Sequence, residues 1–311
     1  MKKIGFVFSG QGSQSVGMGR DLAENFEVCK NIFDKADAAL GYSISSICFD
    51  GPKEELDKTE NTQPAILTVS LAAFEALKSK GVHPYAVAGL SLGEYSALVA
   101  SGVIAFEDAV RFVKKRGFMM QNAVPVGKGK MAAVLGLDAE KLKAVCAEAS
   151  SKGIVECANF NCPGQIVIGG ETEAVDLACE KAKEAGAKKV VPLAVSVPSH
   201  TSVLRDVSAK LAVELSGVEL KNPGIKFLSN VKGDFSETAG EIASLLADQV
   251  MKPVLWQNII EKMISDGITT IIEVGPGKVL SGFNRMISRE IKSYNVEDVK
   301  SLEETIIKLG E

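Results

Sequence analysis

The segment AVAGLSLGEY, residues 86–95, joins an apolar run to a helical pattern through a turn of small residues. Ala86–Leu90 is predicted to be a buried strand, and a helix is predicted to begin at Leu92. Two other apolar runs, Ile4–Phe8 and Thr269–Val274, are also predicted to be strands, and both are followed by glycines. Strands that alternate with helical patterns are typical of an α/β fold with a mostly parallel sheet. The loops that follow such strands gather at one sheet edge, where α/β proteins place their sites.

Between residues 127 and 196 the predicted strands and helices follow a different order. The predicted order is strand, helix, strand, strand, helix, strand, which is the order of a ferredoxin-like (βαββαβ) unit. The predicted elements are Lys130–Leu135, Ala139–Ser150, Ile154–Asn159, Gln165–Gly169, Thr172–Ala185 and Lys188–Ala194. We therefore expect a large α/β domain formed by residues 1–126 and 197–311, with a small domain, residues 127–196, inserted into it. A cleft between the two is the expected substrate site.

Charge and composition narrow the class of protein. The 311 residues include 35 Lys and Arg against 39 Asp and Glu, a net charge of -4, which argues against binding to nucleic acid or to an anionic membrane surface. No apolar stretch approaches the roughly 18 residues of a membrane span. The apolar run after the first three residues is too short for a secretory signal. The six cysteines show no metal-ligand spacing, so we expect reduced thiols and no metal in a cytoplasmic enzyme.

Ser91 is the candidate nucleophile. Residues 89–93 fit the pattern G-x-S-x-G at the predicted junction of a strand and a helix. A sharp turn at that place lifts a serine out of the sheet, and small neighbours let the chain fold back without clashes. The first N–H groups of the following helix can stabilise an oxyanion. The alternative is an ordinary glycine-rich turn between a strand and a helix.

A nucleophilic serine needs a base within hydrogen-bonding reach, and the chain has two histidines. His83 precedes the strand that leads to Ser91, so it is expected at the opposite end of that strand. His200 follows the end of a predicted strand and is therefore the predicted general base. No Asp or Glu lies close to His200 in the sequence, so the group that orients its imidazole cannot be identified locally.

Arg116 lies on the apolar face of a predicted helix, Phe106–Asn122. That face is formed by Ala109, Phe112, Val113, Met119 and Met120. A guanidinium that faces inward is costly unless an anion meets it. The anion could be a protein carboxylate in a buried ion pair. It could equally be a carboxylate of the substrate, which an arginine binds at two points.

Several short motifs, in this order along the chain, resemble the malonyl-CoA:acyl-carrier-protein transacylase family over essentially the whole sequence. They are Phe8–Gln14 (FSGQGSQ), Thr62–Ala65 (TQPA), Gly89–Tyr95 (GLSLGEY), Arg116-Gly117 with Gln121, Asn161–Gln165 (NCPGQ), Val197–His200 (VPSH), Gln249–Val254 (QVMKPV) and Glu273–Gly277 (EVGPG). The resemblance implies an α/β-hydrolase-like large domain with a ferredoxin-like insert.

The resemblance also assigns roles to eight residues. It implies that Ser91 is acylated with His200 as base, and that Gln249 orients His200 through its backbone carbonyl. It implies that the N–H groups of Gln11 and Leu92 form the oxyanion hole. It further implies that Arg116 binds the free malonyl carboxylate, and that Gln63 and Asn161 line the pocket. One position departs from the family, which usually has His where this sequence has Leu90. The departure leaves the selectivity for the acyl group open.

The implied activity is an S-malonyltransferase of fatty acid biosynthesis. Malonyl-CoA and an acyl carrier protein are the expected partners, a monomer is the expected state, and no cofactor is expected because the coenzyme A thioester is a substrate. An acidic carrier needs a basic rim, for which the candidates are Lys114, Lys115, Lys188, Lys189, Arg285 and Arg289. Two alternatives remain: a serine hydrolase such as a thioesterase, and a non-catalytic protein that binds the carrier.

Overall fold

The computed structural model describes residues 2–195 and 197–310 and contains two sheets. The large sheet has the strand order β10-β9-β1-β2-β7-β8. Its strands are β1 (Ile4–Phe8), β2 (Ala86–Gly89), β7 (Lys226–Leu228), β8 (Phe235–Ser236), β9 (Thr270–Val274) and β10 (Lys292–Val296). All neighbouring strands are parallel except β7 and β8. The predicted α/β fold with a mostly parallel sheet is therefore confirmed.

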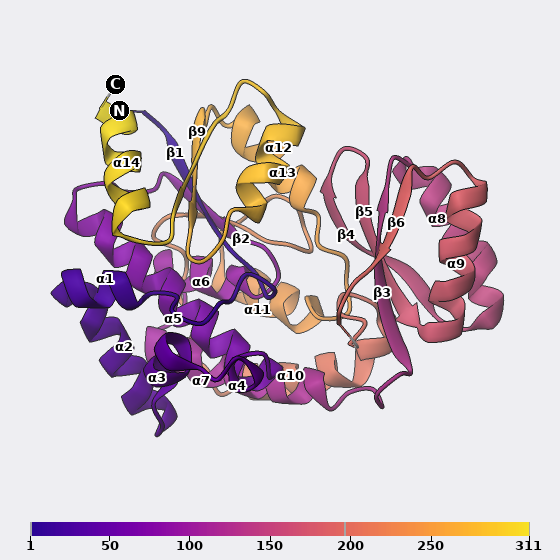
Figure 1. Cartoon of the computed structure of the whole chain (residues 1–311), viewed down its shortest axis with the longest axis horizontal. Coiled ribbons are helices and arrows are strands. Elements are labelled where there is room, and N and C mark those ends of the chain that lie inside the picture. Colours follow the sequence, from indigo (N-terminus) through magenta and orange to yellow (C-terminus); the bar gives the residue numbers. More distant parts are fainter. Residues whose placement is uncertain (1, 196, 311) are drawn as a thin grey trace.

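Helices cover both faces of the large sheet (Figure 1). They are α1 (Arg20–Asn25), α2 (Glu27–Leu40), α3 (Ile44–Asp50), α4 (Lys53–Leu56), α5 (Thr59–Ser79), α6 (Gly93–Ala100), α7 (Phe106–Gln121), α10 (Arg205–Leu215), α11 (Ala239–Asp248), α12 (Trp256–Ser265), α13 (Val279–Ile287) and α14 (Val299–Gly310). Because side chains alternate along a strand, Phe6 and Phe8 join the core formed with α5, whereas Val7 joins the core that contains Trp256 of α12.

The small sheet is antiparallel and has the order β4-β5-β3-β6. Its strands are β3 (Gly129–Leu135), β4 (Val155–Cys162), β5 (Gln165–Glu171) and β6 (Lys189–Pro192), and its helices are α8 (Ala139–Ala149) and α9 (Thr172–Glu184). Figure 1 shows both helices on the side of this sheet that faces away from the large sheet. The predicted order of strands and helices in this segment is confirmed.

Strand β4 differs most from its prediction, since it extends to Cys162 instead of ending at Asn159. Its pairing with β5 shifts register between Cys157 and Asn159 and again between Phe160 and Cys162. Such irregularities break the alternation of apolar and polar side chains by which a strand is recognised. The predicted domain boundary at residue 196 and the chain ends at residues 1 and 311 lie outside the described residues.

Strand β4 also ties the small sheet to the rest of the molecule. The Phe160 N–H donates to the carbonyl of Val254 at 2.9 Å, and the Val254 N–H donates to the carbonyl of Ala158 at 2.9 Å. Asn159 and Val254 form an isolated parallel bridge. The small sheet is therefore tied to the segment that follows Gln249, a residue of the candidate site.

The turn after β2 requires glycine at two positions. A Cβ on Gly93 would lie 2.1 Å from the carbonyl oxygen of Phe8, and one on Gly89 would lie 1.9 Å from the carbonyl oxygen of Gly93. Both distances are far below van der Waals contact, so no other residue fits without moving the backbone. The turn therefore packs against the end of β1 and presents Ser91 at the carboxyl edge of the large sheet.

Among the described residues, no helix combines the length and apolar character needed to cross a membrane.

Candidate active site

The structure brings Ser91 and His200 together, although 108 residues separate them in the sequence. The Nε2 atom of His200 lies 2.7 Å from the Oγ atom of Ser91, and its Nδ1 atom lies 2.8 Å from the carbonyl oxygen of Gln249. Because a carbonyl oxygen can only accept, Nδ1 carries the ring proton, and Nε2 is left to accept the serine proton. A backbone carbonyl thus holds the tautomer that a carboxylate often holds elsewhere.

Ser91 and His200 also share an unusual backbone conformation. Within the described residues they are the two non-glycine residues with positive φ, at 53° and 63°. L-residues adopt this region at a cost, and such strain concentrates at functional sites. His83, by contrast, is exposed in the loop that precedes β2, at the opposite end of the strand from Ser91.

Arg116 lies on α7 and is almost completely buried, with 1% of its surface exposed. Its Nη1 donates to Oε1 of Gln63 at 2.9 Å, and its Nη2 donates to Oε1 of Gln249 at 2.9 Å and faces Oγ of Ser91 at 3.5 Å. Its Nε has no protein partner among the described residues. No described carboxylate lies within ion-pair distance, so a direct buried ion pair is not the explanation for this inward-facing charge.

The nearest carboxylate in this network is Glu94, which reaches Arg116 only through an amide. The Nε2 of Gln249 donates to Oε2 of Glu94 at 2.6 Å, while Oε1 of the same amide accepts from Arg116. Burial raises the pKa of Glu94 to about 7, against the opposing effect of the hydrogen bond from Gln249. The guanidinium of Arg116 therefore meets the amide of Gln249 and not the carboxyl group of Glu94.

The imidazole of His200 is kept in its neutral form. Burial, together with the positive charge of Arg116, lowers the pKa of His200 to about 4. A neutral imidazole is the form that can accept a proton from Ser91. The base is consequently available throughout the neutral pH range.

Gln11 lies in the loop after β1, and Leu92 directly follows Ser91 in the chain. The loop after β1 lies against the turn, because the Leu90 N–H donates to the Phe8 carbonyl at 3.1 Å. Leu92 is buried and directly precedes α6. In the part of the chain that the structure describes, no protein acceptor is assigned to the backbone N–H of either residue.

The two predicted pocket residues differ in how they relate to this cluster. Gln63 lies on α5 and contacts Arg116 directly. Asn161 lies on β4, is 6% exposed, and its Oδ1 has no partner among the described residues. No hydrogen bond between described residues joins Asn161 to Ser91 or Arg116. A buried acceptor without a partner is suited to meet a ligand or a water molecule.

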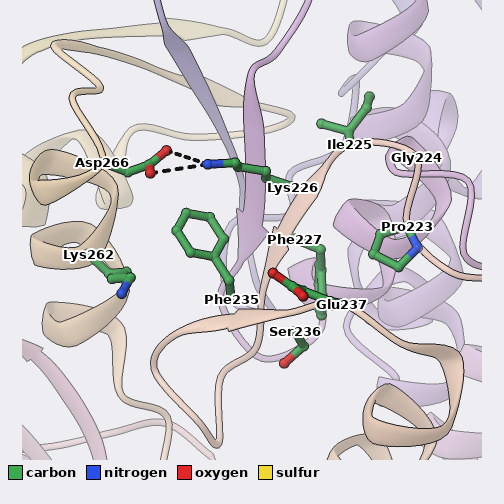
Figure 2. Close-up of a pocket in the computed structure, with 10 residues that line it drawn as sticks. All are labelled: Pro223, Gly224, Ile225, Lys226, Phe227, Phe235, Ser236, Glu237, Lys262 and Asp266. Atoms are coloured by element: carbon green, nitrogen blue, oxygen red, sulfur yellow. Dashed lines mark hydrogen bonds and ion pairs between the residues drawn. The ribbon is translucent and has the colours of Figure 1, made fainter.

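Two pockets lie outside this cluster. One, of about 440 Å³, is shown in Figure 2 at the edge of the large sheet, where Lys226 is paired with Asp266 next to Phe235. The other, of about 850 Å³, lies between the small sheet and the segment after Gln249, and its lining includes Cys157, Arg205 and Lys252. Neither lining includes the serine or the histidine. Within the described residues, no cluster of three His, Cys, Asp or Glu side chains could hold a metal ion.

Sequence reasoning missed Asn230, whose side chain contacts the backbone of Ser91. It gave no role to Glu94, although this residue lies within the motif, three positions after the serine. Asn230 could not have been found from local patterns, because it is 139 residues away from Ser91 in the chain. Helix α6 shows only that Glu94 is near the serine, not what it holds.

The low pKa of His200 predicts how the reactivity of Ser91 depends on pH. The rate of Ser91 modification by a fluorophosphonate should stay constant from neutral pH down to about pH 5 and fall as the pH drops through about 4, where His200 becomes protonated. The measurement is the labelling rate across the pH range, with recovery of the full rate after return to neutral pH as the control for unfolding. A midpoint near the ordinary histidine value of 6.5 would contradict the assignment.

Comparison with known proteins places this geometry in a family. The model of the acyl transferase domain matches residues 5–303. The malonyl CoA-acyl carrier protein transacylase of Bacillus subtilis is 46% identical over 312 residues, which covers 100% of this chain and 98% of that protein. The protein of the same name from Escherichia coli is 46% identical over 288 residues, or 92% of this chain and 93% of that protein.

Solved structures agree with the sequence relatives. The malonyl CoA-acyl carrier protein transacylase of Clostridium perfringens has a TM-score of 0.97 at 48% identity, covering 99% of this chain and 97% of that one. A malonyl transacylase solved in complex with its type II polyketide acyl carrier protein has a TM-score of 0.96 at 42% identity, covering 99% and 100%. With these full-length matches in sequence and fold, the chain belongs to the malonyl-CoA:acyl-carrier-protein transacylase family of acyltransferases.

Proposed function

We propose that this enzyme moves a malonyl group from malonyl-CoA to the phosphopantetheine thiol of an acyl carrier protein, in fatty acid biosynthesis, through an ester on Ser91. The names of its relatives support the activity. The observation that carries the choice of acyl group is the buried guanidinium of Arg116, which lies 3.5 Å from the Ser91 hydroxyl and is held by neutral amides.

The chemistry of a malonyl thioester fits this arrangement. One methylene group separates its reacting carbonyl from its free carboxylate, so a cation beside the nucleophile is within reach of that carboxylate. A buried charge without a counter-ion is costly, and a carboxylate that binds the guanidinium at two points removes that cost. An acetyl thioester has no second carboxylate and gains nothing from Arg116.

In the first half of the reaction, Ser91 gives its proton to Nε2 of His200 and its Oγ attacks the thioester carbonyl. The backbone N–H groups of Gln11 and Leu92 donate to the oxyanion. The Gln249 carbonyl keeps the proton of Nδ1 in place while the ring is positively charged. The tetrahedral intermediate then expels the coenzyme A sulfur, which takes the proton from Nε2, and the malonyl ester remains on Ser91.

In the second half the same groups act in reverse. The pantetheine thiol of the carrier gives its proton to Nε2 of His200, and its sulfur attacks the ester carbonyl. Ser91 leaves and takes the proton back, so one thioester has replaced another with no net change in protons. This scheme needs no cofactor. Transfer instead of hydrolysis requires that water be kept from the ester, which a narrow cleft beside the small sheet would achieve.

We also propose that the chain forms two domains. Residues 1–126 and 197–311 would form an α/β-hydrolase-like domain, and residues 127–196 a ferredoxin-like domain. The strand order β4-β5-β3-β6 and the order of helices within it support the second assignment. We also propose that the protein is cytoplasmic and monomeric.

For the acidic carrier, Arg285 and Arg289 are the stronger candidates among the basic residues. Both are exposed at and after α13. Lys115 instead pairs with Glu214 at 2.5 Å, and Lys114 lies over the ring of Tyr42 at 4.0 Å. Lys188 and Lys189 are exposed at the start of β6, where Lys189 pairs with Leu135 at the end of β3.

A serine hydrolase is the main alternative, because it would use Ser91 and His200 in the same way. It leaves the unpaired guanidinium without a purpose. A non-catalytic protein that binds the carrier would leave the strained backbone of both residues unexplained.

The test of the proposed function is transfer of label. Incubation of the enzyme with radiolabelled malonyl-CoA and a carrier bearing phosphopantetheine should place the label on the carrier, and Ser91→Ala should abolish both the acyl-enzyme and the transfer. Intact-mass and scintillation measurements follow the two steps. Release of the label as free malonate, with none on the carrier, identifies a hydrolase instead.

Arg116 should determine the choice between acyl groups. We expect Arg116→Ala to lower kcat/KM for malonyl-CoA by about 100-fold or more, since a buried charge partner is lost, and to change kcat/KM for acetyl-CoA much less. Arg111→Ala is the matched control, because Arg111 lies on the exposed side of the same helix and pairs with Asp108. Equal losses for the two substrates would show that Arg116 is structural.

A further inference from the structure

Asn230 bridges the two sides of the turn that carries the nucleophile. Its Oδ1 accepts from the Ser91 N–H at 2.7 Å, and its Nδ2 donates to the Gly89 carbonyl at 2.6 Å. The residue is fully buried and follows β7 by two positions. One carboxamide therefore satisfies the donor of Ser91 and the acceptor of the residue two positions before it.

This contact begins where the sheet can no longer hold the chain. Strands β2 and β7 pair only at Ala86 with Lys226 and at Val87 with Phe227. Beyond that point the turn leaves the strand, and its buried N–H and C=O groups need other partners. The side chain of Asn230 supplies hydrogen bonds to the turn where the backbone pairing of β2 and β7 has ended.

Glu94 fixes Asn230 from the other side of the turn. Its Oε1 accepts from the Asn230 N–H at 3.0 Å, and its Oε2 accepts from Nε2 of Gln249 at 2.6 Å. The same Nε2 donates to the carbonyl of Ser91 at 2.8 Å. Asn230 thus holds the N–H of the serine, Gln249 holds its C=O, and the buried carboxylate of Glu94 holds both of these residues.

Such fixation has a purpose at Ser91, because a non-glycine residue with φ of 53° is held in a costly conformation. The conformation persists only where the surroundings over-determine it. Rotation of the Ser91 peptide toward an ordinary conformation would turn Oγ away from Nε2 of His200. It would also turn the next N–H, that of Leu92, away from the oxyanion.

We propose that Asn230 and Glu94 are positioning residues of the nucleophile: Asn230 locks the backbone of Ser91 in its left-handed conformation, and Glu94 locks Asn230 and Gln249 in place. The inference rests on the proposed role of Ser91 as the nucleophile. Neither residue is proposed to touch the substrate. Their loss should therefore slow the attack by Ser91 and leave substrate binding at Arg116 in place.

The test measures the reactivity of Ser91 itself, with a fluorophosphonate probe that needs no malonyl group. We expect Asn230→Ala to lower the labelling rate by about 100-fold and Glu94→Gln by about tenfold, since an isosteric amide cannot accept from both donors in the same way. For the same variants, kcat with malonyl-CoA should fall in parallel, whereas KM should stay within about threefold of the wild-type value.

Asn284→Ala is the matched control for loss of a buried carboxamide. Asn284 is also fully buried, and its side chain makes no hydrogen bond among the described residues. It should label at the wild-type rate. If Asn230→Ala does not fold, Asn230→Asp replaces it: the ionised carboxylate has the same size but cannot donate to Gly89, and we expect about tenfold slower labelling.

The outcomes separate this inference from the proposed function. Labelling of a folded Asn230→Ala variant within about threefold of wild type would overturn the positioning role, whichever acyl donor the enzyme uses. A rise in KM for malonyl-CoA with an unchanged kcat in these variants would also overturn the positioning role. A wild-type enzyme that reacts with the probe at Ser91 but takes up no malonyl group would refute the proposed function alone.

Discussion

A buried guanidinium held by two neutral amides is the constraint around which the site is arranged. Arg116 has lost its water and has gained no carboxylate, so its charge acts at short range on whatever lies beside it. It helps to keep His200 neutral, and it leaves one face toward the Ser91 hydroxyl. The amide of Gln249 couples these effects, because its side chain contacts Arg116 and the Ser91 carbonyl while its backbone carbonyl orients His200.

The topology explains how distant segments supply these groups. Adjacent parallel strands β9, β1 and β2 end at the same edge of the sheet, which places Ser91 beside the loop that follows Phe8. Helices α5 and α7 bring Gln63 and Arg116 against that edge from one side. The bridge between Asn159 and Val254 anchors the small sheet close to Gln249. The small sheet is therefore held next to the segment that supplies Gln249 to the site.

The sequence predicted what local patterns encode and missed what only the fold creates. Ser91 stands out by its motif, His200 by the scarcity of histidines, and Arg116 by its place on an apolar face. The helical period could not tell which anion meets Arg116, because it shows a face and not the neighbour packed on it. Gln249 came only from the family resemblance, since a backbone carbonyl 49 residues from His200 leaves no side-chain signal. Asn230 left none either, and the bulges of β4 hid its full length.

A crystal structure of the enzyme after reaction with malonyl-CoA would test directly whether Arg116 binds the substrate carboxylate. We expect a malonyl ester on Oγ of Ser91, with its free carboxylate within about 3 Å of the guanidinium of Arg116. The ester carbonyl should point at the N–H groups of Gln11 and Leu92. A carboxylate that faces solvent, while Arg116 remains bonded to Gln63 and Gln249, would show that Arg116 does not select the malonyl group.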